Sequence, residues 1–176
     1  KSVGAMDLDL RQQSFFRYAE NRASYAEREG IELALPEMIK LKNSALKNRD
    51  EALDEEEATF GAALEELQDG NDFVLIDCPG THSYFSQLAH ASADTLVTPM
   101  NDSLIDFDLL ARVDPATSNV LGPSVYSEMV WKARQLRARA GLKPIDWIVT
   151  RNRMSNLHAK NKRKVGTLLD DLANRI

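Results

Sequence analysis

The sequence predicts an α/β fold, a three-layer arrangement with a parallel sheet between helices. Segments of strand type alternate with segments of helical periodicity along the chain. The strand-type segments are short, continuous apolar runs, which are typical of parallel strands covered on both faces. No repeat or clear linker interrupts the 176 residues, so residues 1–176 are expected to form a single domain.

Four strands are expected from the apolar runs. They are residues 2–7, which lead into Asp7; residues 72–77, "DFVLID"; residues 93–99, closed by Pro99; and residues 145–150, "IDWIVT", opened by Pro144. Between the first two strands, residues 30–50 show no clean period and are expected to be an irregular connection.

Helical spacing of apolar residues and helix-stopping glycines predict the helices. They are residues 12–29; a helix with Leu53, Phe60, Ala63, Leu64 and Leu67 on one side, stopped by Gly70; residues 84–91; a turn or two at 104–111; residues 124–140; and residues 157–175. The inner side of 124–140 is expected to carry Val125, Met129, Val130, Ala133, Leu136 and Ala140, and that of the last helix Val165, Leu168, Leu169, Leu172 and Ile176.

The composition is that of an ordinary globular protein and excludes several function classes. The net charge of −5 gives no overall attraction to nucleic acid or anionic lipid, so any such binding needs a local basic patch. The one cysteine, Cys78, excludes an intrachain disulfide and fits a reducing compartment. No apolar run approaches the roughly 20 residues that span a bilayer.

Polar residues follow three of the four predicted strands. The first strand runs into Asp7 and "LDLRQ", the second into Asp77 and "CPGT", and the fourth into "TRNR" at 150–153. Ligands of open parallel sheets bind at the carboxyl ends of the strands, so these groups are expected at one edge of the sheet.

The stretch "FVLIDCPG", residues 73–80, is typical of a Walker B segment. Burial of the strand holds Asp77 rigidly at the sheet edge, where it can hold a hydrated Mg²⁺ beside the phosphates of a nucleotide. Gly80 leaves room for the backbone to swing toward a γ-phosphate. An alternative is a strand-end aspartate that caps the following helix, because the same pattern would result.

Five stretches in this order and spacing resemble the ParA/MinD group of deviant-Walker ATPases, within the P-loop NTPase fold. They are "MDLDLRQ", "FVLIDCPG", "TPMNDSLIDFD", "VDP" and "WIVTRNR". The stretches "DLDLRQ", "ENR", "PMNDS" and "RNR" are most similar to the MipZ branch, whose members position the bacterial division plane. The resemblance runs through essentially the whole chain.

The resemblance implies ATP and Mg²⁺ as cofactors and assigns roles by position. Asp9 matches the aspartate near the attacking water, which hydrolysis needs and nucleotide binding does not. Asp7 matches a strand-end carboxylate beside the magnesium waters, and Asp77 matches the Walker B aspartate. Gly80 matches the switch glycine, and Asn152 matches the asparagine that reads the adenine edge, where its amide can donate and accept at once.

The Gly-rich phosphate-binding loop of these ATPases is absent from the sequence. In the family this loop, with its strand and helix, lies upstream of the strand that begins this chain. The chain is therefore expected to be a fragment truncated at both ends, with strand edges and apolar surface exposed where the missing strand belongs. Because the loop supplies the phosphate cradle, we expect no ATP hydrolysis by the 176 residues alone and hydrolysis by the full-length protein.

One basic cluster, "KNKRK", lies near the end of the chain. On a helix, Lys160, Arg163 and Lys164 fall opposite the apolar stripe, with Arg151 and Arg153 expected nearby. A solvated helix face is one interpretation, and sequence-independent contact with DNA phosphates is the other. The resemblance favours DNA, because these ATPases bind DNA non-specifically as ATP-dependent dimers.

The function that these observations favour is an ATP-switched, DNA-associated regulator of division-site placement, cytoplasmic and associated with the nucleoid. The resemblance implies a homodimer and two protein partners, a ParB-like centromere-binding protein and an FtsZ-like tubulin-type division protein. The alternatives are a chromosome or plasmid partition ATPase of the ParA type, a metabolic enzyme of the same fold such as a dethiobiotin-synthetase-like ligase, and a non-catalytic α/β interaction module.

Overall fold

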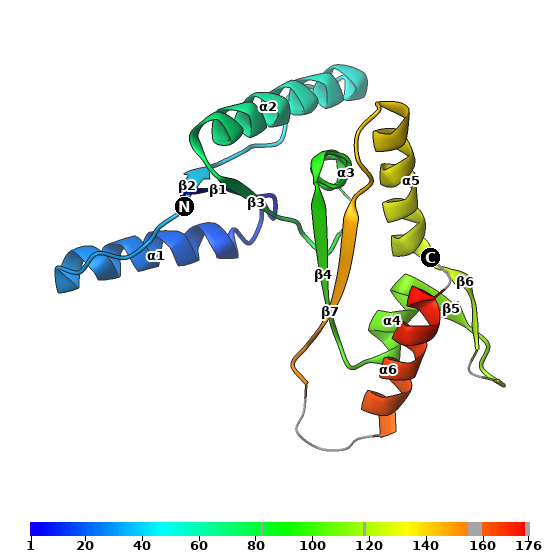
Figure 1. The fold of residues 1–176 in the computed structure, drawn as a ribbon. Coiled ribbons are helices and arrows are strands. Elements are labelled where there is room, and N and C mark those ends of the chain that lie inside the picture. The colour runs from blue at the N-terminus through cyan, green and yellow to red at the C-terminus, as the bar shows by residue number, and fades with distance from the viewer. Residues whose placement is uncertain (82, 118, 155–159, 175–176) are drawn as a thin grey trace. The chain divides into compact units, whose positions relative to one another are not determined.

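The computed structural model in Figure 1 describes residues 1–81, 83–117, 119–154 and 160–174, with the side chains of residues 160 and 161 left out. The chain divides into two compact units, residues 1–89 and 90–176. Each unit has its own parallel sheet. The assignment of residues 1–176 to a single domain stays a prediction.

The first unit has a three-stranded sheet in the order β2-β1-β3, with both pairs parallel. Strand β1 (Val3–Asp7) lies in the middle, between β2 (Glu37–Ile39) and β3 (Phe73–Asp77). The register runs from Val3 opposite Phe73 to Asp7 opposite Asp77. The two strands therefore end level with each other, and their aspartates lie side by side.

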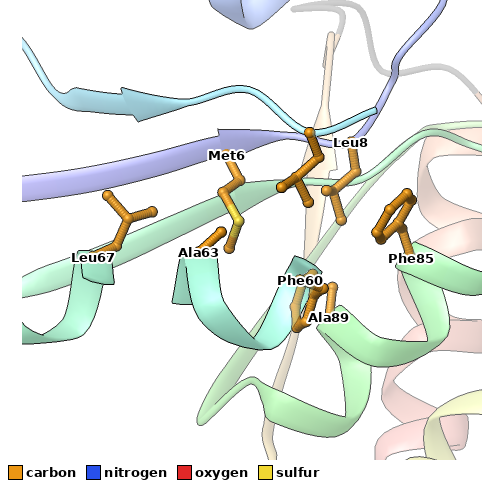
Figure 2. Close-up of a cluster of buried hydrophobic side chains, with 8 residues drawn as sticks. Met6, Leu8, Phe60, Ala63, Leu67, Phe85 and Ala89 are labelled. Atoms are coloured by element: carbon orange, nitrogen blue, oxygen red, sulfur yellow. The ribbon is translucent and has the colours of Figure 1, made fainter. Parts of the chain in front are cut away.

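Helices α1 (Ser14–Glu29), α2 (Arg49–Gly70) and α3 (Tyr84–Ser92) accompany this sheet. Helix α1 contacts β1, and α2 contacts all three strands. Figure 2 shows side chains of β1, α2 and α3 meeting in one apolar cluster. Its buried members are Met6, Leu8, Leu41, Phe60, Ala63, Leu67, Phe85 and Ala89. Burial of this cluster is the main source of stability of the unit.

Helix α2 approaches β1 closely at Gly4. A Cβ atom on Gly4 would lie 2.8 Å from Cδ2 of Leu67 and 2.9 Å from Nδ2 of Asn71. These distances are shorter than carbon contacts tolerate, so only glycine lets the helix lie this near to the strand. The asparagine amide also donates to the Leu67 carbonyl at 3.1 Å and to Glu37 Oε2 at 2.8 Å, which restricts its movement.

The second unit has a parallel pair and an antiparallel hairpin. Strands β4 (Thr95–Asn101) and β7 (Asp146–Asn152) form the pair, and β5 (Ala111–Val113) and β6 (Val120–Pro123) form the hairpin. Its helices are α4 (Leu104–Leu110), α5 (Val125–Arg139) and α6 (Lys160–Ala173). Its buried core comprises Met100, Phe107, Leu110, Ala111, Val120, Val165, Leu168 and Leu172. The apolar stripe predicted for the last helix is confirmed for its described members.

The inner face predicted for residues 124–140 was partly wrong. The buried residues of α5 are Ser127, Val130, Ala133 and Arg137, whereas Val125, Leu136 and Ala140 are exposed. Arg137 is only 5% exposed, because its guanidinium donates to backbone carbonyls that precede β4 and β7 and to Asp94 Oδ1 at 2.8 Å. Because these acceptors compensate its buried charge, Arg137 lies on the inner face of α5, where periodicity had placed Leu136.

The α/β class, the parallel pairing and the alternation of strands with helices are confirmed. Strand β1 is almost wholly buried, but β3, β4 and β7 each leave one face exposed. Phe73 and Leu75 are 54% and 52% exposed on β3, and Val97 and Ile148 are exposed register partners of β4 and β7. Apolar side chains are therefore exposed on strands of both units.

Three further differences concern short elements. Strand β2 lies within the predicted irregular segment 30–50, and the β5–β6 hairpin was not predicted, because three- and four-residue strands are too short to show a period. Strand β4 continues through Pro99 to Asn101. Its one partner in the described chain is β7, and a strand with one unpaired edge can accommodate a proline. Among the described residues, no helix is long and apolar enough to cross a membrane.

The close approach at Gly4 gives a stability prediction. We expect Gly4→Ala to lower the free energy of unfolding by about 1–3 kcal/mol, because the added methyl forces α2 away from β1. Urea denaturation would measure the change. Gly61→Ala is the matched control, since a Cβ there meets open space within α2 and should stabilise by up to about 1 kcal/mol. Equal stability of Gly4→Ala and wild type would contradict the predicted clash.

Candidate functional site

The carboxyl ends of β1 and β3 bring three aspartates together in the first unit. Asp7 and Asp77 are register partners at the last position of their strands. The chain then turns at Leu8, whose backbone N–H donates to the Asp77 carbonyl at 2.8 Å, and Asp9 follows. The prediction that Asp7, Asp9 and Asp77 share one edge of the sheet is therefore met within this unit.

The Asp7 carboxylate is buried and occupied by backbone donors. Only 4% of the residue is exposed. Its Oδ1 accepts the N–H of Asp9 at 3.0 Å, and its Oδ2 accepts those of Phe15 at 3.1 Å and Phe16 at 3.0 Å. Three N–H groups and the positive end of the α1 dipole compensate the burial of this charge.

Asp9 lies half-buried in the loop between β1 and α1. Its Oδ1 accepts the N–H of Gln12 at 3.0 Å, and its carbonyl accepts that of Gln13 at 2.8 Å. Its Oδ2 has no hydrogen-bond partner among the residues that the structure describes. The loop closes at Gln13 with φ 47° and ψ 41°, a left-handed conformation that is uncommon for residues other than glycine.

Asp77 differs from Asp7 in having an open carboxylate. It is exposed, and within the described part of the chain its side chain accepts no hydrogen bond. Partial desolvation raises the pKa of the Asp77 carboxyl above its ordinary value, and the negative charges of Asp7 and Asp9 raise it further. Of the two strand-end aspartates, Asp77 is therefore the one whose carboxylate is open to a cationic ligand.

The helix-capping alternative for Asp77 is wrong. Ser83 caps α3 instead: its Oγ accepts the N–H of Ser86 at 3.1 Å, and its carbonyl accepts that of Gln87 at 3.2 Å. The strand-end aspartate that does cap a helix is Asp7, on α1. The sequence could not distinguish the two, because both aspartates follow an apolar strand.

Two neighbours of Asp77 have contrasting environments. Burial and the charge of Asp77 raise the pKa of the Cys78 thiol to about 11, so it stays protonated at neutral pH and is a poor nucleophile. At Gly80, by contrast, an added Cβ would meet nothing within 4 Å. Local packing does not require a glycine at this position, and its role as a switch glycine stays a prediction.

Asn152 lies at the end of β7 in the second unit, opposite Asn101 at the end of β4. It is exposed, and its Oδ1 accepts the N–H of Arg153 at 2.8 Å. The side-chain NH₂ group of Asn152 has no acceptor among the described residues, so it is available to an external ligand. Asn101 is held by Asp106, whose Oδ2 accepts its backbone and side-chain N–H groups at 3.0 Å.

The residues "MNDS", 100–103, at the end of β4 make contacts inside the second unit. Met100 is buried in the core, and Ser103 caps α4. Asp102 accepts from Arg151 Nε at 2.6 Å, and Arg151 also donates to the Lys162 carbonyl at 2.7 Å. The opposite signs of Asp102 and Arg151 were the one sequence signal for this pair, and their separation along the chain hid it.

The basic cluster lies on the first turns of α6. Arg163 is exposed and Lys164 is half-buried, while the side chain of Lys160 lies outside the described residues. Arg151, expected near this cluster, does contact the first turn of α6, but its guanidinium is engaged by Asp102 and Lys162. Among the described side chains of the basic cluster, Arg163 is thus the most open to solvent.

A comparison with protein families matches residues 1–176, the whole chain, to the family described as ATPase MipZ. The chain belongs to the MipZ ATPase family. This agrees with the resemblance found in the "DLDLRQ", "FVLIDCPG" and "RNR" stretches. A search of curated proteins found no match. Membership in MipZ supports an ATPase that takes part in positioning the division site.

An ATPase family implies a nucleotide and Mg²⁺, and Mg²⁺ would need a carboxylate with free acceptor capacity. No group of three or more His, Cys, Asp or Glu side chains in the described residues has the arrangement of a metal site. Mg²⁺ keeps several waters and takes few protein ligands, so one open carboxylate is enough. Asp77, which lies near two other negative charges, fits this requirement, whereas Asp7 has little capacity left.

The raised pKa of Asp77 gives a pH prediction. Because the folded state holds this proton more tightly than the unfolded state, the ionised carboxylate destabilises the fold at neutral pH. We expect Asp77→Asn to be more stable than wild type at pH 7. The difference should shrink as the pH falls through the raised pKa and vanish below the ordinary value of 3.8.

Urea midpoints measured from neutral to acidic pH would check this prediction. Glu66→Gln on the exposed side of α2 is the control and should change the midpoint little at any pH. An Asp77→Asn variant no more stable than wild type at pH 7 would contradict the raised pKa of the Asp77 carboxyl.

Proposed function

We propose that the full-length protein is an ATP-switched regulator of division-site placement that hydrolyses ATP at the carboxyl ends of β1 and β3. The observation that carries this proposal is the meeting of Asp9 and Asp77 at one edge of a parallel sheet, in a chain that matches MipZ over its whole length. Ligands of such sheets bind at this edge.

The two aspartates have separate roles in this proposal. Asp77 holds the waters of Mg²⁺, which would neutralise charge on the phosphates when bound. Asp9 orients the attacking water through its Oδ2, while its Oδ1 stays bonded to Gln12. The phosphate cradle would come from the Gly-rich loop that the resemblance implies.

Asn152 is proposed to read the adenine edge of ATP. Its exposure at the end of β7 and its available amide N–H₂ group suit an aromatic nitrogen acceptor. Arg153, in a left-handed conformation with φ 51°, donates its backbone N–H to the side-chain oxygen of Asn152 and so fixes the amide orientation.

The regulatory part of the proposal follows the family. An ATP-bound homodimer would bind DNA without sequence preference and engage a ParB-like centromere-binding protein and an FtsZ-like division protein at the nucleoid. Exposed Arg163, with Lys160 and Lys164 on the same helix, supports the DNA contact. A ParA-type partition ATPase would share the site but move DNA cargo, and co-localisation with the centromere complex without any effect on FtsZ-like assembly would favour it.

The hydrolytic role of Asp9 can be tested in the full-length protein. We expect Asp9→Asn to lower kcat by at least about 100-fold while ATP still binds, because the variant lacks the charged acceptor of the water proton. Steady-state phosphate release and nucleotide binding by fluorescence would measure the two effects. Asp69→Asn, at an exposed position of α2, is the control. Full activity of Asp9→Asn would overturn the assignment.

The DNA contact has its own prediction. Replacing Lys160, Arg163 and Lys164 by alanine should weaken binding about equally for unrelated duplexes. The slope of log K against log salt should fall by about one for each phosphate that the protein no longer neutralises. Fluorescence anisotropy at several salt concentrations would measure both effects. Lys132→Ala with Arg139→Ala, on exposed positions of α5, is the control pair. Unchanged affinity and slope in the triple variant would remove α6 from the DNA-binding surface.

A further inference from the structure

Asp7 caps a helix from a distant position in the chain. Helix α1 begins at Ser14 after Gln13, which occupies the N-cap position but makes no side-chain cap and has a left-handed backbone. Phe15 and Phe16 are the second and third residues of the helix, whose N–H groups an N-cap side chain ordinarily satisfies. Asp7 Oδ2 accepts both, at 3.1 and 3.0 Å.

The other oxygen of Asp7 holds the backbone of Asp9. Oδ1 accepts the Asp9 N–H at 3.0 Å. The same carboxylate thereby connects the end of β1, the loop that carries Asp9 and the first turn of α1. Gln13 closes this loop in a left-handed conformation that is unfavourable for a residue with a side chain, so the loop depends on contacts that hold it in place.

The remaining capacity of the Asp7 carboxylate is small. An ionised carboxyl oxygen accepts about two hydrogen bonds, so Oδ2 is fully used. Oδ1 has one acceptor direction left, on a residue that is 4% exposed. Asp77, by contrast, presents an exposed carboxylate at the neighbouring strand end. Of the two register partners, Asp77 is the one suited to hydrated Mg²⁺.

We propose that Asp7 is a positioning residue: its carboxylate clamps the Asp9 backbone to the amino end of α1 and so orients the Asp9 side chain, and it does not contact the waters of Mg²⁺. This inference rests on the proposed function, because it assigns the orientation of the residue that activates water. It replaces the role that the family resemblance implied for Asp7.

The test compares Asp7→Asn with wild type in the full-length protein. Asparagine has the same shape, but its NH₂ group cannot accept, so one side of the clamp opens. We expect kcat to fall at least about 10-fold, with KM for ATP and the half-saturating Mg²⁺ concentration changed less than about 2-fold. Without nucleotide, hydrogen exchange of the Asp9 amide or of the Phe15 and Phe16 amides should rise at least about 10-fold.

The opposite pattern would overturn the proposal. A half-saturating Mg²⁺ concentration raised about 5-fold or more, with unchanged amide exchange, would make Asp7 part of the cation site. A normal kcat in Asp7→Asn together with accelerated amide exchange would overturn the positioning role. Opening the clamp would then have no effect on catalysis by Asp9. Absence of ATP hydrolysis by the wild-type protein is a distinct result, since it would overturn the proposed function itself.

A second pair of variants leaves Asp7 unchanged, which guards against an Asp7 variant that does not fold. Phe15→Pro and Phe15→Ala both remove the ring, but only proline removes the N–H that donates to Asp7, and proline is tolerated in the first turn of a helix. We expect a further fall in kcat of at least about 3-fold in the proline variant at unchanged half-saturating Mg²⁺. Equal kcat in the two variants would contradict the clamp.

Discussion

The parallel register of β1 and β3 is the constraint on which the candidate site depends. It places Asp7 opposite Asp77, and the 2.8 Å bond from the Leu8 N–H to the Asp77 carbonyl carries the alignment one residue beyond the strand. Helix α2 packs its apolar face against β1, and this close packing is possible because Gly4 has no side chain. A shift of one residue would send the aspartates to the opposite face of the sheet and bury their charge against the apolar cluster.

The two strand-end aspartates then acquire different chemistry from their surroundings. Asp7 is enclosed, and three backbone N–H groups compensate its charge. Asp77 is open, without such donors in the described chain, and its pKa is raised by lost hydration and by its two acidic neighbours. One carboxylate therefore serves the geometry of the Asp9 loop, and the other is available to a cation. In the proposed ATPase this separation keeps Asp9 oriented whether or not a nucleotide is bound.

In the second unit, the polar residues after β4 and β7 mainly hold the unit together. Asn101 is fixed by Asp106, and Asp102 by Arg151, which also reaches the first turn of α6. One Asp102 oxygen stays buried without a partner among the described residues, a cost that the ion pair with Arg151 offsets. The start of the basic helix is thus connected to the strand end that carries Asn152, and both belong to one internally bonded unit.

The sequence by itself determined the α/β class, the four long strands, the main helices and the identity of Asp7, Asp9 and Asp77 as strand-end carboxylates, because apolar runs and the glycines that stop helices are local signals. It also contained the stretches that mark the MipZ family, which the whole-chain match confirmed. Short strands such as β2 and the β5–β6 hairpin were missed, because they are defined by their partners and not by a period. The tertiary structure alone decided which aspartate caps a helix, that Arg137 is buried among carbonyl groups, and that Asp102 pairs with Arg151, because each depends on donors and acceptors brought together from distant parts of the chain.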